Sequence, residues 1–374
     1  MRILIDYRSA LRARSGVGEY VHQVASHLAS DYPGDSLTLF TSSWKDRPEP
    51  NLKTRWPNVH MSDHRLPVAL LNLVWHNLEW PPVELVATGE YDVVLSAHPL
   101  LTPTRRAAQV VTIHDIDFLR HPERTQREVR RDYPRLVRSH ARRADRVIVP
   151  SRYTAGEVIE VLGVPRERLS LCPPGAPVWP TPIVRPLSAN GHVLFMGTLE
   201  PRKNVGMLLG AYQSLLARHR NLPKLILAGT AAPEAQPWLD AVSRPPLAGH
   251  VEHIGYVTGD DRQRIYSGAR ILVLPSFNEG FGMPVLEAMS LGIPVIASDR
   301  GALPELVGDA GLLVSPDAED SLVSAIERLL TDDRLAETLA RRGRERAREF
   351  DWHRTARAVR QAFEEAIDAR AHRN

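Results

Sequence analysis

The sequence predicts an α/β fold made of two βα domains joined by a proline-rich linker. Short apolar runs, such as residues 271–274 and 293–297, alternate with helical patterns, as buried parallel strands alternate with their crossover helices. The alternation starts again after residues 173–190, a segment with six prolines and little periodicity. A length of 374 residues is sufficient for two domains of ordinary size.

The composition is that of a folded globular protein, and it narrows the classes of function. Apolar residues make up 43% of the chain, and the basic residues are interspersed with 44 acids, so nucleic-acid binding is not indicated. The single cysteine, Cys172, excludes an intrachain disulfide and a cysteine cluster for zinc, which fits a cytoplasmic protein. The first residues read as a strand rather than a signal peptide, and no apolar run is long enough to predict a membrane-spanning helix.

The first domain, residues 1–172, is expected to begin with a strand, a loop and a helix. The predicted strands of this domain are residues 2–7, 36–42, 91–97, 108–113, 146–149 and 169–172. Gly16 and Gly18 open the first helix, where a glycine turn allows close approach to a phosphate; a plain turn is the alternative. Ser151 is placed to cap a later helix, and residues 46–61 read as irregular.

Two segments of the first domain have unusual compositions. Residues 66–80 are apolar with one acid, which favours a core helix; a membrane-touching wedge or a face for an acceptor or partner are the alternatives. Residues 120–146 contain ten arginines against four acids. Such a run is usually a solvated helix face, but a basic helix can also attract anionic lipid headgroups. Contact with an anionic membrane surface is therefore a hypothesis.

The second domain, residues 191–350, repeats the alternation of strands and helices. Its predicted strands are residues 192–196, 224–228, 251–254, 271–274 and 293–297, and helices are expected at 205–216, 321–330, 334–348 and, beyond the domain, 352–370. Gly197 follows the first of these strands, and Arg202 and Lys203 stand just before a helix start. Their charges suit a phosphate, which arginine holds through a planar fork and lysine as a point charge; two exposed basic residues are the alternative.

The stretch 277–298 forms a strand–loop–helix–strand unit that organises the second domain. Glu279 lies on the loop, where Gly280 and Gly282 let the backbone approach a ligand and present N–H groups at a helix start. Pro284 suits the first helical turn, and Glu287 is expected in the same turn, where the helix N-terminus would keep it ionised. The alternative is that Glu287 only complements the helix dipole.

Glu279 and Glu287, with Gly–Phe–Gly–Met–Pro between them, resemble the paired-glutamate signature of family 4 of the retaining glycosyltransferases. The resemblance implies the GT-B fold, with two Rossmann-like βα domains facing across a cleft. It places the acceptor on residues 1–172 and the nucleotide sugar on residues 191–350. It also implies that the C-terminal helix, residues 351–374, crosses back to the first domain. Most of its specificity lies in the second domain.

The resemblance also assigns roles to single residues. Glu279 would lie by the donor sugar, Arg202 and Lys203 on the phosphates, and His114 near the sugar, and these four residues are the predicted catalytic set. The donor-binding residues that it implies are Gly16, Gly18, Gly197, Tyr256, Val257, Phe281, Gly282, Met283, Val285, Leu286 and Glu287, the last of them on the nucleotide ribose.

No metal and no cofactor are expected. Asp115–Ile116–Asp117 is a DxD string, which holds a metal in other glycosyltransferases, but the strand-hairpin context of that other fold is missing here. The pair Glu279 and Glu287 also argues against a metal. Arg202, Lys203, Gly197 and the helix N-terminus after Gly282 would stabilise the leaving group instead.

The implied activity is retaining, metal-independent transfer of a hexose from a nucleotide diphosphate sugar to a hydroxyl of a glycan or glycolipid, as in polysaccharide or lipopolysaccharide biosynthesis. Residues 75–80 and 114–115 look most like the mannosyltransferase-like members, which favours GDP-mannose as the donor. A GT-B phosphorylase or epimerase and a non-catalytic interaction subunit stay open as alternatives. The expected location is the cytoplasm, at the inner face of the membrane if the basic segment binds lipid.

Overall fold

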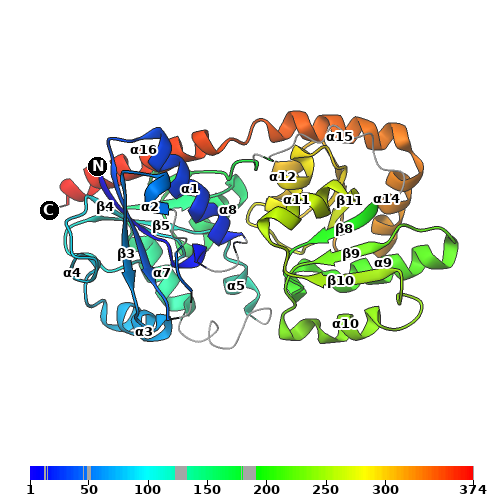
Figure 1. Ribbon diagram of the computed structural model, residues 1–374, viewed down its shortest axis with the longest axis horizontal. Coiled ribbons are helices and arrows are strands. Elements are labelled where there is room, and N and C mark those ends of the chain that lie inside the picture. Colours follow the sequence, from blue (N-terminus) through cyan, green and yellow to red (C-terminus); the bar gives the residue numbers. More distant parts are fainter. Residues whose placement is uncertain are drawn as a thin grey trace. The chain divides into compact units, whose positions relative to one another are not determined.

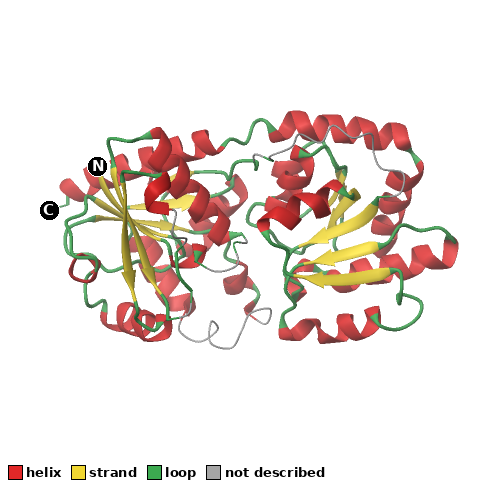
Figure 2. Ribbon diagram, in the orientation of Figure 1, coloured by secondary structure: helices red, strands yellow, loops and turns green. Residues whose placement is uncertain are grey.

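The computed structural model describes all residues except 12, 13, 15, 45, 49–51, 123–132, 178, 180–190 and 374. The chain divides into two compact units (Figure 1). Unit 1 comprises Met1–Gly175 and Asp351–Asn374, and unit 2 comprises Ala176–Phe350. Most of the predicted linker lies outside the described residues. In each unit, helices cover both faces of a central sheet (Figure 2), so both strand faces are buried, as their short apolar runs predict.

Unit 1 contains a seven-stranded parallel sheet with the order β3-β2-β1-β4-β5-β6-β7. Its strands are Arg2–Asp6 (β1), Ser36–Ser42 (β2), Val59–His64 (β3), Val93–Ser96 (β4), Ala108–Thr112 (β5), Arg146–Val149 (β6) and Leu169–Leu171 (β7). Its helices are Val17–Asp31 (α1), Leu52–Arg55 (α2), Val68–Leu78 (α3), Val83–Val86 (α4), Asp117–Arg120 (α5), Tyr133–Arg143 (α7), Arg152–Glu157 (α8) and Trp352–Ala371 (α16).

Unit 2 contains a six-stranded parallel sheet with the order β10-β9-β8-β11-β12-β13. Its strands are His192–Met196 (β8), Leu225–Ala228 (β9), Val251–Gly255 (β10), Ala269–Leu274 (β11), Val295–Ser298 (β12) and Leu312–Val314 (β13). Its helices are Val205–Arg218 (α9), Gln236–Val242 (α10), Gly259–Ser267 (α11), Met283–Ser290 (α12), Leu303–Val307 (α13), Glu319–Thr331 (α14) and Asp333–Ala347 (α15).

The two sheets share the doubly wound strand order, which reverses at a central pair of strands. In unit 1 this pair is β1 and β4, and in unit 2 it is β8 and β11. Ligands of such sheets bind beyond the carboxyl ends of the strands at this point of reversal. The predicted α/β fold with Rossmann-like domains is confirmed, and the loops that follow β8 and β11 are the first place to look for a site.

Two edge strands were not predicted. These strands are β3 and β13. Residues 46–61, which were expected to be irregular, include α2 and the start of β3. Edge strands have a partner on one side only, and β3 is less buried than the central strands: Val59 is its one buried residue. A search for continuous apolar runs finds central parallel strands and overlooks such edges. By contrast, the predicted cap at Ser151 is confirmed, since its hydroxyl accepts a hydrogen bond from the Thr154 N–H at 3.0 Å.

The expectation of a core helix at residues 66–80 is only half right. Helix α3 buries Trp75 completely, and the Trp75 indole donates to the Pro81 carbonyl at 3.0 Å. Other apolar side chains of the segment are exposed: Leu70 is 54% exposed, Leu73 61%, Leu78 at the end of α3 71%, and Trp80 beyond it 62%. Hydrophobicity alone could not distinguish the buried side from the exposed one, because both are apolar. The exposed side needs an explanation of its own.

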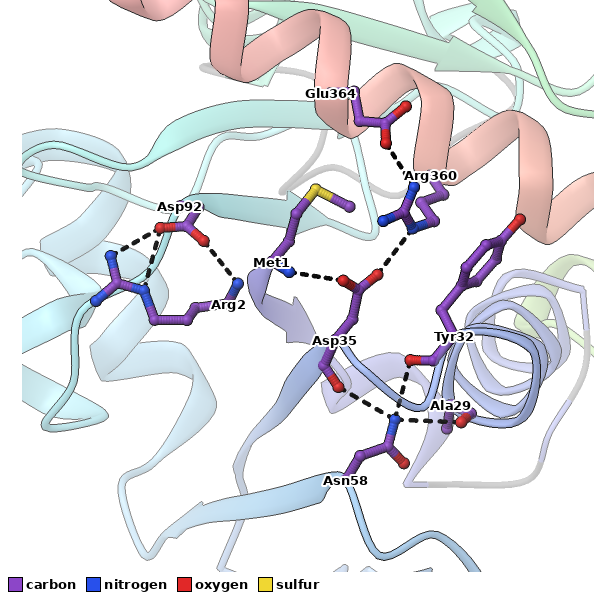
Figure 3. Close-up of polar contacts among 9 residues, drawn as sticks. All are labelled: Met1, Arg2, Ala29, Tyr32, Asp35, Asn58, Asp92, Arg360 and Glu364. Atoms are coloured by element: carbon purple, nitrogen blue, oxygen red, sulfur yellow. Dashed lines mark hydrogen bonds and ion pairs between the residues drawn. The ribbon is translucent and has the colours of Figure 1, made fainter.

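Helix α16 belongs to unit 1, where it packs against α1 and β5 and buries Trp352, Val359 and Phe363. Asp35 lies where α16 meets the start of β1 (Figure 3). Its carboxylate accepts from the Met1 amino group at 2.6 Å and from Arg360 Nε at 2.8 Å. Burial would raise the pKa of Asp35, but the hydrogen bonds from Arg360 and the Met1 amino group outweigh it, so the pKa is lowered. Asp35 thus fixes α16 to the first strand.

Replacing Asp35 by asparagine should lower the free energy of unfolding by about 2 kcal/mol at neutral pH, because two charged donors lose their acceptor. Since the pKa of Asp35 is lower in the folded state, the stabilisation is complete above the unfolded value of about 3.9 and is lost as the pH falls through the folded value. The difference between wild type and Asp35→Asn in urea unfolding should therefore shrink in acid.

The matched control is Glu364→Gln on the same helix. Glu364 also pairs with Arg360, but at the exposed surface, and its removal should cost less than about 0.5 kcal/mol. Equal losses in the two variants would show that Asp35 does not fix α16 as described.

Candidate active site

The two loops at the point of strand reversal in unit 2 are joined to each other. The first follows β8 and contains Gly197 and a 3-10 turn, Pro201–Lys203; the second follows β11. The Phe277 N–H of the second loop donates to the Arg202 carbonyl of the first at 2.9 Å. The Asn204 side chain donates to the Pro275 carbonyl at 3.2 Å. Residues that are about 76 positions apart in the sequence are therefore held together.

A buried ion pair lies between these loops. Lys203 Nζ donates to Glu279 Oε1 at 2.5 Å, and the Ser276 hydroxyl donates to the same oxygen at 2.7 Å. Burial would raise the pKa of Glu279, but the charges of Lys203 and Arg202 and the hydrogen bonds from Lys203 and Ser276 outweigh it. The pKa of Glu279 is thus lowered, and the carboxylate is an ionised acceptor at neutral pH.

Arg202 lies beside this pair. Its guanidinium donates to the Asn278 carbonyl at 2.9 Å and to Glu200 at 2.9 Å, and it lies 3.4 Å from Glu279 Oε2. The alternative of two exposed basic residues is wrong, because Lys203 is buried. The sequence did not predict that both cations pair with carboxylates of their own unit.

Glycines bring the backbone close to the ion pair. A Cβ on Gly197 would lie 3.7 Å from Lys203 Cε, so the Gly197 backbone runs beside the lysine. A Cβ on Gly229 would meet the Gly197 carbonyl oxygen at 2.0 Å, and one on Gly301 would meet Glu279 N and O at 2.7 Å. The Ala302 N–H also donates to the Glu279 carbonyl at 2.9 Å. Gly229 and Gly301 were missed because their importance depends on contacts distant in sequence.

Gly282 precedes α12 with a φ of +109°, a conformation that favours glycine. The N–H groups of Val285 and Leu286, two of the predicted donor-binding residues, both donate to the Gly282 carbonyl. Their side chains are buried in the core. Pro284 has no N–H, so the first-turn amide that stays available for a ligand in this described segment is that of Met283.

Glu287 lies in the second turn of α12 and not in the first, since the helix begins at Met283. The carboxylate is buried and is paired with Arg262 of α11, whose Nη2 lies 2.6 Å from Oε1. The Tyr266 hydroxyl, also from α11, donates to Oε2 at 2.6 Å. Arg262 and Tyr266 were missed in the sequence, although their spacing of four residues puts both on one face of a helix.

The remaining predicted donor-binding residues of unit 2 differ in how far their side chains are buried. Tyr256 is partly exposed and follows Gly255, which ends β10 with a φ of +70°. Val257 is buried. Phe281 is also buried and packs edge-on against Phe350, with ring centroids 5.6 Å apart. The Phe281 side chain therefore supports the loop, so any ligand contact falls to its backbone.

In unit 1, His114 follows β5 at the carboxyl end of the sheet. Its ring packs edge-on against Tyr20 of α1, with centroids 5.2 Å apart. Burial lowers the pKa of His114 to about 4, against an opposing effect of Asp115, so the imidazole is neutral at physiological pH. Its Nε2 is buried and has no hydrogen-bond partner among the residues that the structure describes.

Gly16 and Gly18, the two glycines at the start of α1, have different structural roles. Gly16 is the N-cap of α1, with a φ of +51° and nothing near the place of a Cβ. Gly18 instead packs against the chain, since a Cβ there would meet the Ser9 carbonyl oxygen at 2.4 Å. The Asp115 side chain of the DxD string accepts the Asp117 N–H at 3.2 Å, which is a local turn contact.

Two sheets of doubly wound order, with cations and a buried carboxylate where the order of the second reverses, are typical of a GT-B glycosyltransferase. Family models support this class along most of the chain. The model described as "Glycosyltransferase Family 4" matches residues 14–178, and that described as "Glycosyl transferases group 1" matches residues 190–332.

Known proteins agree with this result. The chain is 30% identical over 367 residues to O-antigen chain mannosyltransferase B of Escherichia coli, which covers 94% of this chain and 96% of that protein. The chain belongs to this family of GT-B glycosyltransferases, and it is an enzyme of that class. Sucrose-phosphate synthase from Thermosynechococcus elongatus has a similar fold, with a TM-score of 0.78 and 23% identity over 98% of this chain and 99% of that one. HepE from Anabaena, solved in complex with UDP and glucose, also has a similar fold, with a TM-score of 0.73 and 20% identity over 97% of this chain and 99% of that one.

Replacing Gly301 by alanine should lower kcat by roughly 10²-fold, because the new methyl group would displace the backbone of Glu279. The control is Gly308→Ala, which has a positive φ of 55° but nothing within 4 Å of the new Cβ. Both variants should lose roughly 1–2 kcal/mol of stability through backbone strain. Thermal unfolding and initial rates separate the two effects, and a similar loss of kcat in Gly308→Ala would contradict the role of Gly301.

Proposed function

We propose that this protein is a retaining, metal-independent mannosyltransferase that transfers mannose from GDP-mannose to a hydroxyl of a glycan or glycolipid. The similarity to O-antigen chain mannosyltransferase B along nearly the whole of both chains carries this proposal, because the name of that relative specifies the sugar. A place in polysaccharide biosynthesis, including that of lipopolysaccharide O-antigen, follows from the same similarity.

The leaving diphosphate would be stabilised by Arg202, Lys203 and the Met283 N–H. The N–H of Gly197 donates to the Ala228 carbonyl at 2.8 Å, so the contribution of Gly197 would be the close approach that its backbone allows. Preorganised donors of this kind contribute roughly 3–4 kcal/mol each to a transition state. Arg202 presents a planar fork to phosphate oxygens, and Lys203 presents a point charge. These cations supply the positive charge that a metal provides in other transferases, which supports metal independence.

Glu279 is better suited to holding a sugar hydroxyl than to forming a covalent bond. Oε1 already accepts from Lys203 and Ser276, and Oε2 lies 3.4 Å from Arg202. These partners lower its nucleophilicity, as they lower its pKa. Retention would then come from attack on the same face as the leaving group, with the departing phosphate taking the proton of the acceptor hydroxyl. His114, neutral at physiological pH, would contact the sugar through Nε2.

We also propose that unit 1 binds an anionic membrane surface through α3 and α7. The two helices meet where Glu79, just after α3, pairs with Arg143 of α7 at 2.7 Å. The exposed leucines of α3 offer apolar area, and Arg135, Arg138 and Arg142 of α7 are exposed. Such a combination is typical of interfacial binding. In the described part of the chain, no helix has both the length and the hydrophobicity to span a bilayer.

GDP-mannose should raise the thermal unfolding temperature more than UDP-glucose or UDP-galactose do, because only the matching donor binds tightly enough to stabilise the folded state by mass action. The stabilisation should persist in EDTA. With octyl α-mannoside as a probe acceptor, nuclear magnetic resonance should show an α-linked product, as retention of the donor configuration requires.

Arg202→Ala should lose turnover by roughly 10²–10³-fold and keep its fold. Arg264→Ala, which removes an exposed arginine paired with Asp261, is the control and should keep full activity. Selective stabilisation by a UDP-sugar would overturn GDP-mannose as the donor, a β-linked product would overturn retention, and loss of activity in EDTA would overturn metal independence.

Vesicles containing phosphatidylglycerol should bind the protein in a flotation assay, and vesicles of phosphatidylcholine alone should not. Substituting Arg135 and Arg138 by glutamine should weaken binding by about 2 kcal/mol, or roughly 30-fold. Leu73→Ser should also weaken it, whereas Leu313→Ser, at an exposed leucine of unit 2, should not. Equal flotation with both lipids would contradict the membrane proposal.

A further inference from the structure

Unit 2 contains a second buried carboxylate with partners that the proposed reaction does not use. Glu287 of α12 is buried, and Arg262 approaches it with two nitrogens: Nη2 lies 2.6 Å from Oε1 and 2.7 Å from Oε2, and Nε lies 3.0 Å from Oε2. A buried carboxylate is costly unless it is paired and hydrogen-bonded. Arg262 meets this requirement for Glu287, as Lys203 does for Glu279.

Tyr266 holds the other side of the carboxylate. It is fully buried, and its hydroxyl donates to Glu287 Oε2 at 2.6 Å. Burial and the charge of Glu287 raise the pKa of Tyr266 well above its ordinary value, so it stays a donor. The Ser290 hydroxyl donates to the Glu287 carbonyl at 2.7 Å and accepts from the Trp179 indole at 2.8 Å. Backbone and side chain of Glu287 are both fixed.

The two carboxylate oxygens are not equally occupied. Oε2 receives Arg262 Nε, Arg262 Nη2 and the Tyr266 hydroxyl, whereas Oε1 receives Arg262 Nη2 alone. Each carboxylate oxygen has two lone pairs, so Oε1 can accept one more hydrogen bond within this described set of contacts. The most favourable place for an incoming hydroxyl is therefore Oε1.

We propose that Arg262 is a positioning residue for the nucleotide: together with Tyr266 it turns Glu287 so that Oε1 accepts a hydrogen bond from a ribose hydroxyl of a nucleoside diphosphate. This inference rests on the proposed function and on the family resemblance, which implies that Glu287 contacts the nucleotide ribose. Arg262 stays paired when the nucleotide binds, because charge-assisted hydrogen bonds are roughly twice as strong as neutral ones and a ribose hydroxyl cannot replace them. Arg262 therefore acts through Glu287.

The test is the discrimination ratio, defined as the Kd for the 2′-deoxy or 3′-deoxy nucleotide, whichever is weaker, divided by the Kd for GDP. Calorimetry should give a ratio of roughly 10 or more for wild type, because a hydrogen bond to a charged group is lost. Glu287→Ala should lower the ratio to about 1. Arg262→Met should lower it similarly, and Arg262→Lys should restore part of it.

Arg264→Met is the matched control, since Arg264 lies on the same helix but is exposed and pairs with Asp261. Its ratio should equal that of wild type. A general loss of structure would weaken both nucleotides alike and leave the ratio unchanged, so the ratio distinguishes positioning from support of the fold. Arg262→Lys keeps the test valid if Arg262→Met does not fold.

An Arg262→Met variant that binds GDP weakly but keeps the wild-type ratio would overturn this inference and leave the proposed function standing. A variant that binds GDP more tightly would also overturn it, because Arg262 would then compete with the ribose. If wild type binds UDP instead of GDP, the donor proposal fails, and the same ratio measured with UDP and its deoxy forms still decides the role of Arg262. A wild-type ratio near 1 would overturn both the ribose assignment and this inference.

Discussion

The buried contact between Lys203 and Glu279 is the interaction on which the candidate site depends. It joins the loop after β8 to the loop after β11, at the point where the strand order of unit 2 reverses. Neither charge is stable there alone, since removing one partner of a buried pair costs about 3–5 kcal/mol. Two glycines leave room for the backbone here, since a Cβ on Gly229 would meet the Gly197 carbonyl oxygen at 2.0 Å and one on Gly301 would meet Glu279 N and O at 2.7 Å.

The same arrangement occurs at Glu287, where α11 supplies both the cation and the hydroxyl. Each carboxylate is thus held by partners from a neighbouring segment of unit 2. The groups that would meet a sugar, a ribose and a diphosphate are then ordered by the protein itself. Ordering them during folding lowers the entropic cost of binding and of reaching the transition state. It also explains why these charges are buried rather than exposed to water.

The parts of this structure that follow local rules could be predicted from the sequence. Central strands such as β8 and β11 are apolar runs, and Arg202, Lys203 and Glu279 stand next to the turns that end them. Features set by distant contacts could not be predicted. β3 is polar because it lies at an edge of the sheet. Arg262 pairs with Glu287 only because α11 lies against α12, and Gly301 must be small because the Glu279 backbone lies next to it. Glu287 was misplaced by one turn because the first residue of a helix is the least certain part of such a prediction.

Both units have a buried ion pair at the carboxyl end of a central strand. In unit 1 this pair follows β1, where Arg8 Nη2 lies 2.7 Å from Asp6 Oδ2. Unit 1 adds two histidines, His98 after β4 and His114 after β5, and burial lowers the pKa of both. Neutral imidazoles can donate or accept a hydrogen bond without competing for a counter-ion. Neutral imidazoles in unit 1 suit the proposed reaction, in which the acceptor reacts through a neutral hydroxyl. The cations Arg202 and Lys203 of unit 2 suit its other half, because the bond that breaks would leave its electrons on phosphate.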